Sequence, residues 1–206
     1  MKHRGTLIIA CGALAREIAA LRRANAWEGI DVRCLPAELH NRPERITPAV
    51  QAEISAQRAH YDQIFVAYAD CGTGGQLDAL LQAEGIERLP GAHCYEFFAT
   101  PEVFAALAEA EPGTFYLTDF LLKNFERFVI RPLGFDRHPQ LKDEYFRNYR
   151  RLVYLAQVEK PENIERARRI ARDFGFEFEY RHTGYGQLGT RLAGVAVVQE
   201  RAPWRA

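Results

Sequence analysis

The first hundred residues alternate between short apolar runs and segments of helical periodicity, and this alternation restricts the fold more than any other feature of the chain. Ile64 to Ala67 form an unbroken apolar run, which is typical of a strand buried on both faces. Strands that alternate with helices form a parallel sheet covered by helices. We therefore predict an α/β fold with a Rossmann-like parallel sheet. The predicted strands here are residues 6–10, 31–35, 63–68 and 86–89, and the predicted helices are 13–25, 48–60 and 77–85.

The second half of the chain continues in the same style without repeating the sequence. The predicted helices are 101–110, 120–128, 140–150 and 161–174, and the predicted strands are 114–117, 152–156 and 177–181. No Gly-, Ser- or Pro-rich linker separates the halves. We expect a Rossmann-like half at 1–100, which carries the candidate site, packed against a second α/β half at 101–206. Two related halves around a cleft and one larger sheet both fit, and the polar tail 200–206 is expected to fray.

The charge balance and hydropathy exclude several classes of partner. Lys+Arg and Asp+Glu are equal at 27 each, so no overall field attracts nucleic acid or an anionic membrane. No apolar run reaches transmembrane length, and Arg16 and Glu17 interrupt the apolar stretch near the start. We expect a cytoplasmic protein in which the four cysteines are free thiols or metal ligands. The sequence does not identify its small-molecule or protein partner.

Three of these cysteines follow predicted strands. Cys11, Cys71 and Cys94 each stand where an apolar run gives way to a turn. Parallel strands present their carboxyl ends at one edge of the sheet, where open α/β folds bind ligands. Thiolates select zinc or iron–sulfur clusters, so we predict a metal or cluster site of these three thiols, with His40 or His93 as a fourth ligand.

Two other interpretations of the cysteines stay open. A buried cysteine often only fills an apolar site, and one of the three thiols could instead be a reactive nucleophile. No CxxC pair is present, so the metal prediction depends on the predicted fold. Cys34 lies inside a predicted strand and is expected to serve packing alone.

The glycine loop after the third strand suggests a second kind of ligand. Gly72, Thr73 and Gly74 lie between a buried strand and a helix, where backbone N–H groups can bind a small anion. The loop lacks the Walker lysine and the dinucleotide fingerprint, so a tight turn explains it equally. Carboxylates at strand ends are candidates to bind ligand, orient a histidine or carry protons, although Asp at a strand end is often a helix N-cap. These carboxylates are Asp70, Glu96 and Asp119.

Several phrases of the sequence together resemble the uncharacterised bacterial and archaeal family numbered 1638 among domains of unknown function. These phrases are IACGALAREI, LPAELHNRPERI, YADCGTGGQLD, RLPGAHCYEFFA, PGTFYLTDFL, FRNYRRLVYLAQ and RHTGYGQL. The resemblance implies a role connected with corrinoid-dependent methyl transfer, because members of the family are often encoded near such methyl-transfer systems. It also implies that the family pattern includes Cys11, His40, Cys71, His93, Cys94 and Asp119.

The expected function is therefore a thiolate-based metal- or cluster-binding protein, as an enzyme or accessory factor in corrinoid or one-carbon metabolism. The first alternative is a metal-free protein that binds a small anion or acts in maturation. The second is a cysteine-dependent hydrolase or transferase.

Overall fold

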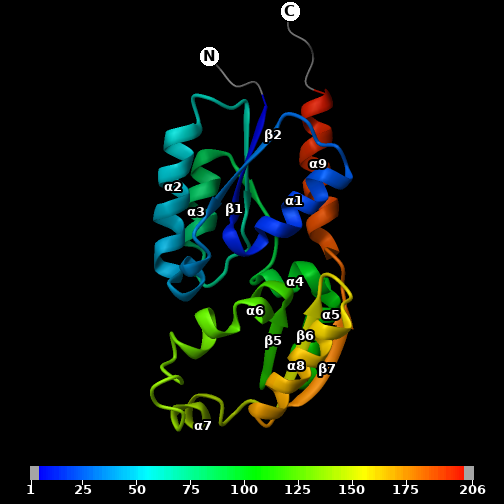
Figure 1. Ribbon diagram of the computed structural model, residues 1–206. Coiled ribbons are helices and arrows are strands. Elements are labelled where there is room, and N and C mark those ends of the chain that lie inside the picture. The colour runs from blue at the N-terminus through cyan, green and yellow to red at the C-terminus, as the bar shows by residue number, and fades with distance from the viewer. Residues whose placement is uncertain (1–4, 202–206) are drawn as a thin grey trace, which may run out of the picture. The chain divides into compact units, whose positions relative to one another are not determined.

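The chain forms two units, each with its own parallel sheet (Figure 1). The computed structural model describes residues 5–201, and the side chains up to residue 196. The first unit contains Met1–Phe97 together with Gln187–Ala206, and the second contains Phe98–Gly186. The α/β class is confirmed. Most of the tail predicted to fray, residues 202–206, lies outside the described residues.

The sheet of the first unit has the order β2-β1-β3-β4, and all its strands are parallel. Its strands are β1 (Thr6–Cys11), β2 (Ile30–Leu35), β3 (Gln63–Ala67) and β4 (Glu87–Arg88). Leu7 to Ala10 in β1 are completely buried because β1 lies between two strands and under helices on both faces. The apolar runs therefore become the core of this unit.

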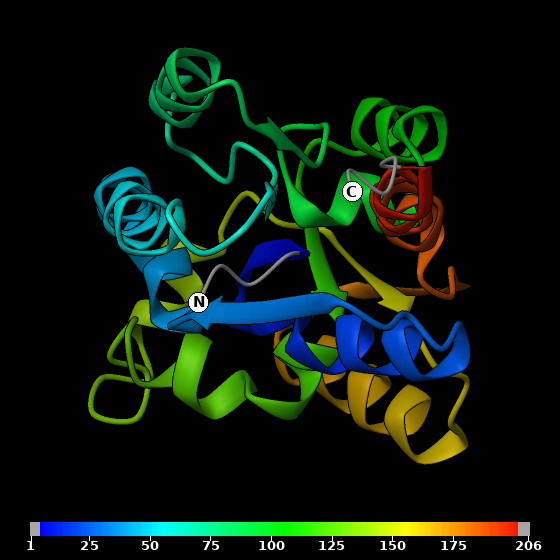
Figure 2. The same ribbon diagram turned by 90° about the horizontal axis from the view of Figure 1, so that it is seen from above.

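Helices cover both faces of this sheet (Figure 2). In Figure 1, α2 and α3 lie on one face, and α1 and α9 lie on the other. Gly85 ends α3 in the left-handed conformation, as the sequence predicted. The α-helices are α1 (Ala15–Ala24), α2 (Ile46–Gln57), α3 (Gln76–Glu84), α4 (Cys94–Ala99) and α9 (Gly186–Arg201), and short 3-10 helices cover Gly12–Leu14, Ala37–Asn41 and Pro43–Arg45.

The C-terminal helix α9 belongs to the first unit, although it follows the second unit in the chain. The sequence analysis assigned no helix to this segment, in which Gly189 and Gly194 lower the helix propensity. A Cβ atom added to Gly189 would lie 3.5 Å from the Leu21 side chain, so this glycine lies against α1. The packing of α9 on α1 thus brings the end of the chain back to the first sheet.

The second unit contains a separate parallel sheet in the order β5-β6-β7. The prediction of helix 140–150 is wrong beyond Tyr145, because Arg150 and Arg151 donate backbone hydrogen bonds to Gly113 and lead the chain into β6. The predicted helix 120–128 is divided into α6 and a π-helical turn. The elements are β5 (Thr114–Thr118), β6 (Arg151–Ala156), β7 (Glu177–His182), α5 (Pro101–Ala110), α6 (Asp119–Lys123), the π turn Glu126–Ile130, α7 (Leu141–Tyr145) and α8 (Pro161–Asp173).

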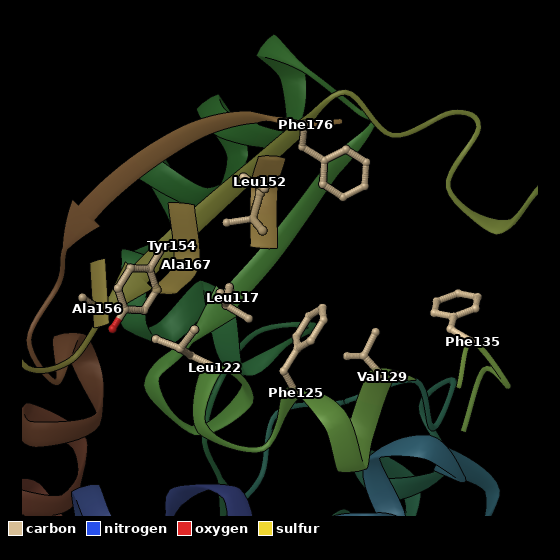
Figure 3. Close-up of a cluster of buried hydrophobic side chains, with 11 residues drawn as sticks. Leu117, Leu122, Phe125, Val129, Phe135, Leu152, Tyr154, Ala156, Ala167 and Phe176 are labelled. Atoms are coloured by element: carbon tan, nitrogen blue, oxygen red, sulfur yellow. The ribbon is translucent and has the colours of Figure 1, made fainter. Parts of the chain in front are cut away.

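The core of the second unit is rich in aromatic rings. Leu152 and Tyr154 on the central strand β6 are fully buried and pack with residues of the neighbouring helices (Figure 3). Phe146 and Phe174 meet edge to face with their ring centroids 5.2 Å apart, a geometry that aromatic quadrupoles favour. Within residues 5–201, no helix combines the length and the apolar character that crossing a membrane takes.

Candidate functional site

The three cysteines singled out in the sequence all stand at the carboxyl edge of the first sheet. Cys11 is the last residue of β1, Cys71 follows β3, and Cys94 begins α4 after β4. β1 pairs with β3, and β3 with β4, so the three loops leave neighbouring strands. The strand order therefore places all three cysteines at the same edge of one sheet. Cys34 differs, since it is exposed on β2, and the expectation that it packs in the interior is wrong.

Backbone hydrogen bonds join the loop of Cys71 to the loop that precedes Cys94. The N–H of Asp70 donates to Gly91 at 3.1 Å, and the N–H of Cys71 donates to Ala92 at 2.8 Å. Cys71 has a φ of 51°, a left-handed conformation that costs a residue with a side chain about 1–2 kcal/mol. The surrounding hydrogen bonds hold this strained backbone, as is common at functional sites.

Burial suppresses the ionisation of all three thiols. Burial raises the pKa of Cys71 to about 12, and the neighbouring Cys11 adds to this effect. Burial also raises the pKa of Cys94, with further contributions from Cys71 and Cys11, and burial raises the pKa of Cys11. All three are therefore neutral thiols at pH 7. Cys11 and Cys71 are thus electrostatic neighbours of Cys94, and Cys11 of Cys71.

Tyr68 was not predicted from the sequence, and it supplies a polar group beside the thiols. Its hydroxyl is buried and has no hydrogen-bond partner of regular geometry among the described residues. Burial raises the pKa of Tyr68, and the nearby Cys11 and Cys71 raise it further. Because Tyr68 continues the apolar run of β3, its sequence context indicated only a core residue. The structure instead places a buried hydroxyl next to Cys11, and its interaction with this sulfur lowers the pKa of Cys11 against the effect of burial.

Arg88 is a second residue that sequence reasoning missed. Its guanidinium donates to both carboxylate oxygens of Asp78, at 2.6 and 2.8 Å, and to the carbonyls of Leu89 and Gly91, at 2.6 and 3.2 Å. The Asp78 hydrogen bonds raise the pKa of Arg88, and Cys71 is one of its electrostatic neighbours. Arg88 thus fixes the loop that leads to Cys94 and places a positive charge near the thiols. The only feature of the sequence that could have indicated this role is the presence of an arginine within the predicted strand 86–89.

The glycine loop already contains an anion of its own, the Asp70 carboxylate. Asp70 accepts hydrogen bonds from the Thr73 hydroxyl at 2.5 Å and from the N–H groups of Gly74 and Gly75 at 3.2 and 3.0 Å. The Thr73 hydrogen bond is the main cause that lowers the pKa of Asp70. The amides considered for an external anion therefore have an internal acceptor. The backbone of Gly72, which has φ of 84°, also helps lower the pKa of Asp70, and this glycine lies against Pro43.

Glu96 also binds its own loop. Its carboxylate accepts from the N–H of Ala92 at 2.8 Å, and a Cβ atom on Gly91 would lie 2.8 Å from the same oxygen. Only glycine leaves room for this oxygen. The φ of 96° at Gly91 is a second reason for glycine at this position. The contact gives Glu96 a structural role in the turn between β4 and α4.

The two histidines lie near each other at the same edge of the sheet. His40 belongs to the 3-10 helix after β2, and His93 directly precedes Cys94. Partial burial lowers the pKa of His40, and His93 lowers it further. The lowered pKa favours the neutral imidazole, which is the form that binds metals. No histidine is among the described groups that shift the pKa values of Cys11, Cys71 and Cys94.

Asp119 lies in the second unit, at the carboxyl end of β5. Its carboxylate accepts from the Tyr154 hydroxyl at 2.6 Å and from the N–H of Val158 at 3.0 Å. The N-cap of α6 is Thr118, whose hydroxyl accepts from Leu121 at 3.3 Å. Asp119 therefore joins neighbouring strands of its own sheet rather than capping the helix that follows.

In their present positions, no three His, Cys, Asp or Glu side chains of the described part of the chain form a group that could hold a metal ion. The thiols are neighbours, but their sulfur atoms are not arranged as a ready-made ligand set. Protonated thiols have no electrostatic reason to adopt such an arrangement, because metal ligation requires their deprotonation.

Comparison with known proteins identifies a family without a known activity. The family model described as "Protein of unknown function (DUF1638)" matches residues 34–192, which include Cys71, Cys94 and both histidines at the edge, while Cys11 precedes the match. No curated protein and no solved structure matches the chain. Since the matched segment covers more than half of the sequence, the chain belongs to the DUF1638 family of proteins of unknown function.

Proposed function

We propose that this protein binds zinc or an iron–sulfur cluster through Cys11, Cys71 and Cys94. The proposal is supported by the position of three thiols after three neighbouring strands, with the buried hydroxyl of Tyr68 beside Cys11 and Cys71. Sulfur ligands select zinc, copper(I) and iron–sulfur clusters over harder cations. Three thiolates leave one coordination position for a histidine or for a reacting molecule.

The ionisation of the thiols favours a metal over nucleophilic catalysis. A catalytic cysteine needs a lowered pKa or an adjacent base, whereas burial and mutual repulsion raise the pKa of Cys71 to about 12. A bound cation would lower the pKa values of these thiols, because it attracts the negative charges of the three thiolates, which otherwise repel one another. The group would supply a Lewis-acidic or redox-active centre at this edge.

Tyr68 and Arg88 are the residues suited to support deprotonated thiols. The Tyr68 hydroxyl lies near Cys11 and can donate a hydrogen bond once that thiol becomes a thiolate. Arg88 fixes the loop before Cys94 and contributes positive charge near Cys71. Donors and charges around the ligands are a regular part of metal sites, because they orient the ligands and tune their basicity.

His40 and His93 remain the candidates for a fourth ligand. Ligation requires a neutral imidazole, and the lowered pKa of His40 favours that form. Asp70 and Glu96 hold the adjacent loops through hydrogen bonds. A role in corrinoid or one-carbon metabolism is part of the proposal and is supported by the family resemblance alone.

The test is metal and sulfide analysis of protein purified without oxygen, together with its absorption spectrum. We expect about one zinc ion per chain, or iron with acid-labile sulfide and visible absorption. Cys71→Ser, Cys94→Ser and Cys11→Ser should each lower the metal content at least five-fold. Cys34→Ser is the matched control and should retain the metal, since Cys34 is exposed on β2.

Metal-free protein that stays folded and takes up neither zinc nor iron with sulfide on reconstitution would overturn the proposal. Equal metal loss in Cys34→Ser and Cys71→Ser would also count against it, because adventitious thiol binding would then explain the signal. Rapid alkylation of a single thiol at pH 7, with no metal bound, would point to the cysteine hydrolase or transferase instead.

A further inference from the structure

The first sheet ends at β2, whose outer side offers unpaired backbone groups. The Thr6 N–H donates to the Gly29 carbonyl at 3.1 Å, so the backbone of Gly29, and of every second residue after it, points toward β1. The N–H and C=O groups of Ile30, Val32 and Cys34 therefore point away from the sheet. Within residues 5–201, no strand pairs with this side of β2 (Figure 2). Such an edge is a template for another strand.

We propose that this edge pairs antiparallel with β2 of a second copy of the chain, with Val32 at the two-fold axis. Two copies of one strand form an isologous interface when they run antiparallel. The outward backbone groups of Ile30 and Val32 would then hydrogen-bond those of the partner's Cys34 and the partner's Val32. The two four-stranded sheets would become one continuous sheet.

Charge complementarity selects this register over its neighbours. Asp31 and Arg33 lie two residues apart and share one face of β2. With Val32 at the axis, Asp31 lies opposite the partner's Arg33, and each Arg33 lies opposite the partner's Asp31. A register centred on Asp31 would oppose two carboxylates, and one centred on Arg33 would oppose two guanidinium groups. Opposite charges across a strand pair stabilise it, while like charges destabilise it.

Arg33 is available for this contact. Its side chain is exposed, and it forms no ion pair within the described residues. Asp31 accepts a hydrogen bond from the Tyr61 hydroxyl at 2.9 Å, which uses one carboxylate oxygen and fixes the side chain at the edge. The pair therefore presents one free cation beside one oriented anion.

The opposite face of β2 offers apolar surface at the same edge. Val32 and Cys34 line a groove of about 440 Å³ between β2 and α1, together with Ile18 and Trp27. Because Val32 lies at the proposed axis, the grooves of two copies would meet there. The apolar groups that line both grooves would lose contact with water, and this burial adds to the backbone hydrogen bonds.

The oligomeric state of the full chain tests the proposal by light scattering and sedimentation between about 1 and 100 µM. We expect a dimer. Asp31→Arg and Arg33→Asp each place like charges opposite one another and should weaken dimerisation at least ten-fold. The combined Asp31→Arg/Arg33→Asp variant restores opposite charges and should recover the dimer. Arg45→Asp is the control, since Arg45 is exposed and lies outside β2.

Cross-linking through Cys34 tests the register. In the proposed pairing Cys34 lies opposite the partner's Ile30, so the two Cys34 residues are separated by about four residues, or roughly 14 Å along the strands. A bis-maleimide of that span should link the dimer, and Cys34→Ser should abolish the product. A monomer at every concentration, a dimer unaffected by both single charge reversals, or a cross-link that persists in Cys34→Ser would each overturn the proposal.

Discussion

The carboxyl edges of the two sheets differ in how completely their polar groups are satisfied. At the second edge, Asp119 accepts from Tyr154 and Val158, and its own N–H donates to Gln157 at 2.9 Å. The side-chain amide of Gln157 in turn donates to Leu155 at 2.8 Å. Every partner in this chain of hydrogen bonds belongs to the unit itself. The carboxylate of the second edge is thus fully used within its unit, although the neighbouring Tyr180 hydroxyl on β7 has no hydrogen-bond partner of regular geometry among the described residues.

The first edge contains polar groups that the protein itself does not pair. Burial raises the pKa values of three thiols, the Tyr68 hydroxyl has no hydrogen-bond acceptor of regular geometry among the described residues, and Cys71 has a strained backbone. Each of these features costs stability in the free protein, and a bound ligand would compensate for it. Two parallel sheets with the same local architecture thus differ in the chemistry of their strand ends, which is where α/β proteins keep their sites.

The largest expected effect comes from removing the central acceptor of the second edge. Asp119→Ala leaves the buried Tyr154 hydroxyl and the Val158 N–H without their acceptor, and we expect a loss of about 2–3 kcal/mol in the free energy of unfolding. Urea denaturation measures this. The rate of cysteine alkylation in the native protein should not change, because the three thiols lie in the first unit.

A double-mutant cycle checks the reason for this loss. Tyr154→Phe removes the donor of the same hydrogen bond, so Asp119→Ala/Tyr154→Phe should cost less than the sum of the two single variants. Asp143→Ala, at an exposed position on α7, is the control and should change stability by less than about 0.5 kcal/mol. Strict additivity would show that the hydrogen bond between these side chains is not the cause.

A moderate effect is expected from raising the pH. A thiol whose pKa is higher in the folded state stabilises the fold below its ordinary pKa near 9, and that stability is lost as pH rises toward the folded value of about 12. The ionisation of the Cys71 thiol alone should lower the free energy of unfolding of the metal-free protein by about 1–1.5 kcal/mol between pH 7 and pH 10. Urea denaturation at both pH values should show a smaller decrease in Cys71→Ala. An equal decrease in the variant would refute this source of pH dependence.

The smallest effect concerns the backbone strain at Cys71. Glycine adopts a φ of 51° without steric cost, whereas alanine does not. We expect Cys71→Gly to be more stable than Cys71→Ala by about 0.5–1 kcal/mol, since the greater freedom of glycine in the unfolded chain cancels part of the gain. Thermal unfolding of the two variants measures the difference. The opposite order of stability would contradict the left-handed conformation at this position.

Much of the secondary structure was predictable because its signals are local. Pro101 and Ala110 bound α5 as predicted, and Pro161 begins α8 as predicted. Errors occurred where tertiary contacts override periodicity, as in the segment after Tyr145, where backbone hydrogen bonds to Gly113 end the helix. The glycines of α9 concealed a helix that packing against α1 stabilises.

The sequence by itself determined the α/β class, most of the strands, and the position of Cys11, Cys71 and Cys94 at strand ends, because apolar periodicity and turn residues act over a few neighbouring positions. Only the tertiary structure decided that there are two separate sheets and that β1, β3 and β4 are neighbours. It also decided that the Asp70 carboxylate occupies the glycine loop and that Tyr68 faces the thiols. These features depend on contacts between residues far apart in the chain, which local sequence patterns do not predict.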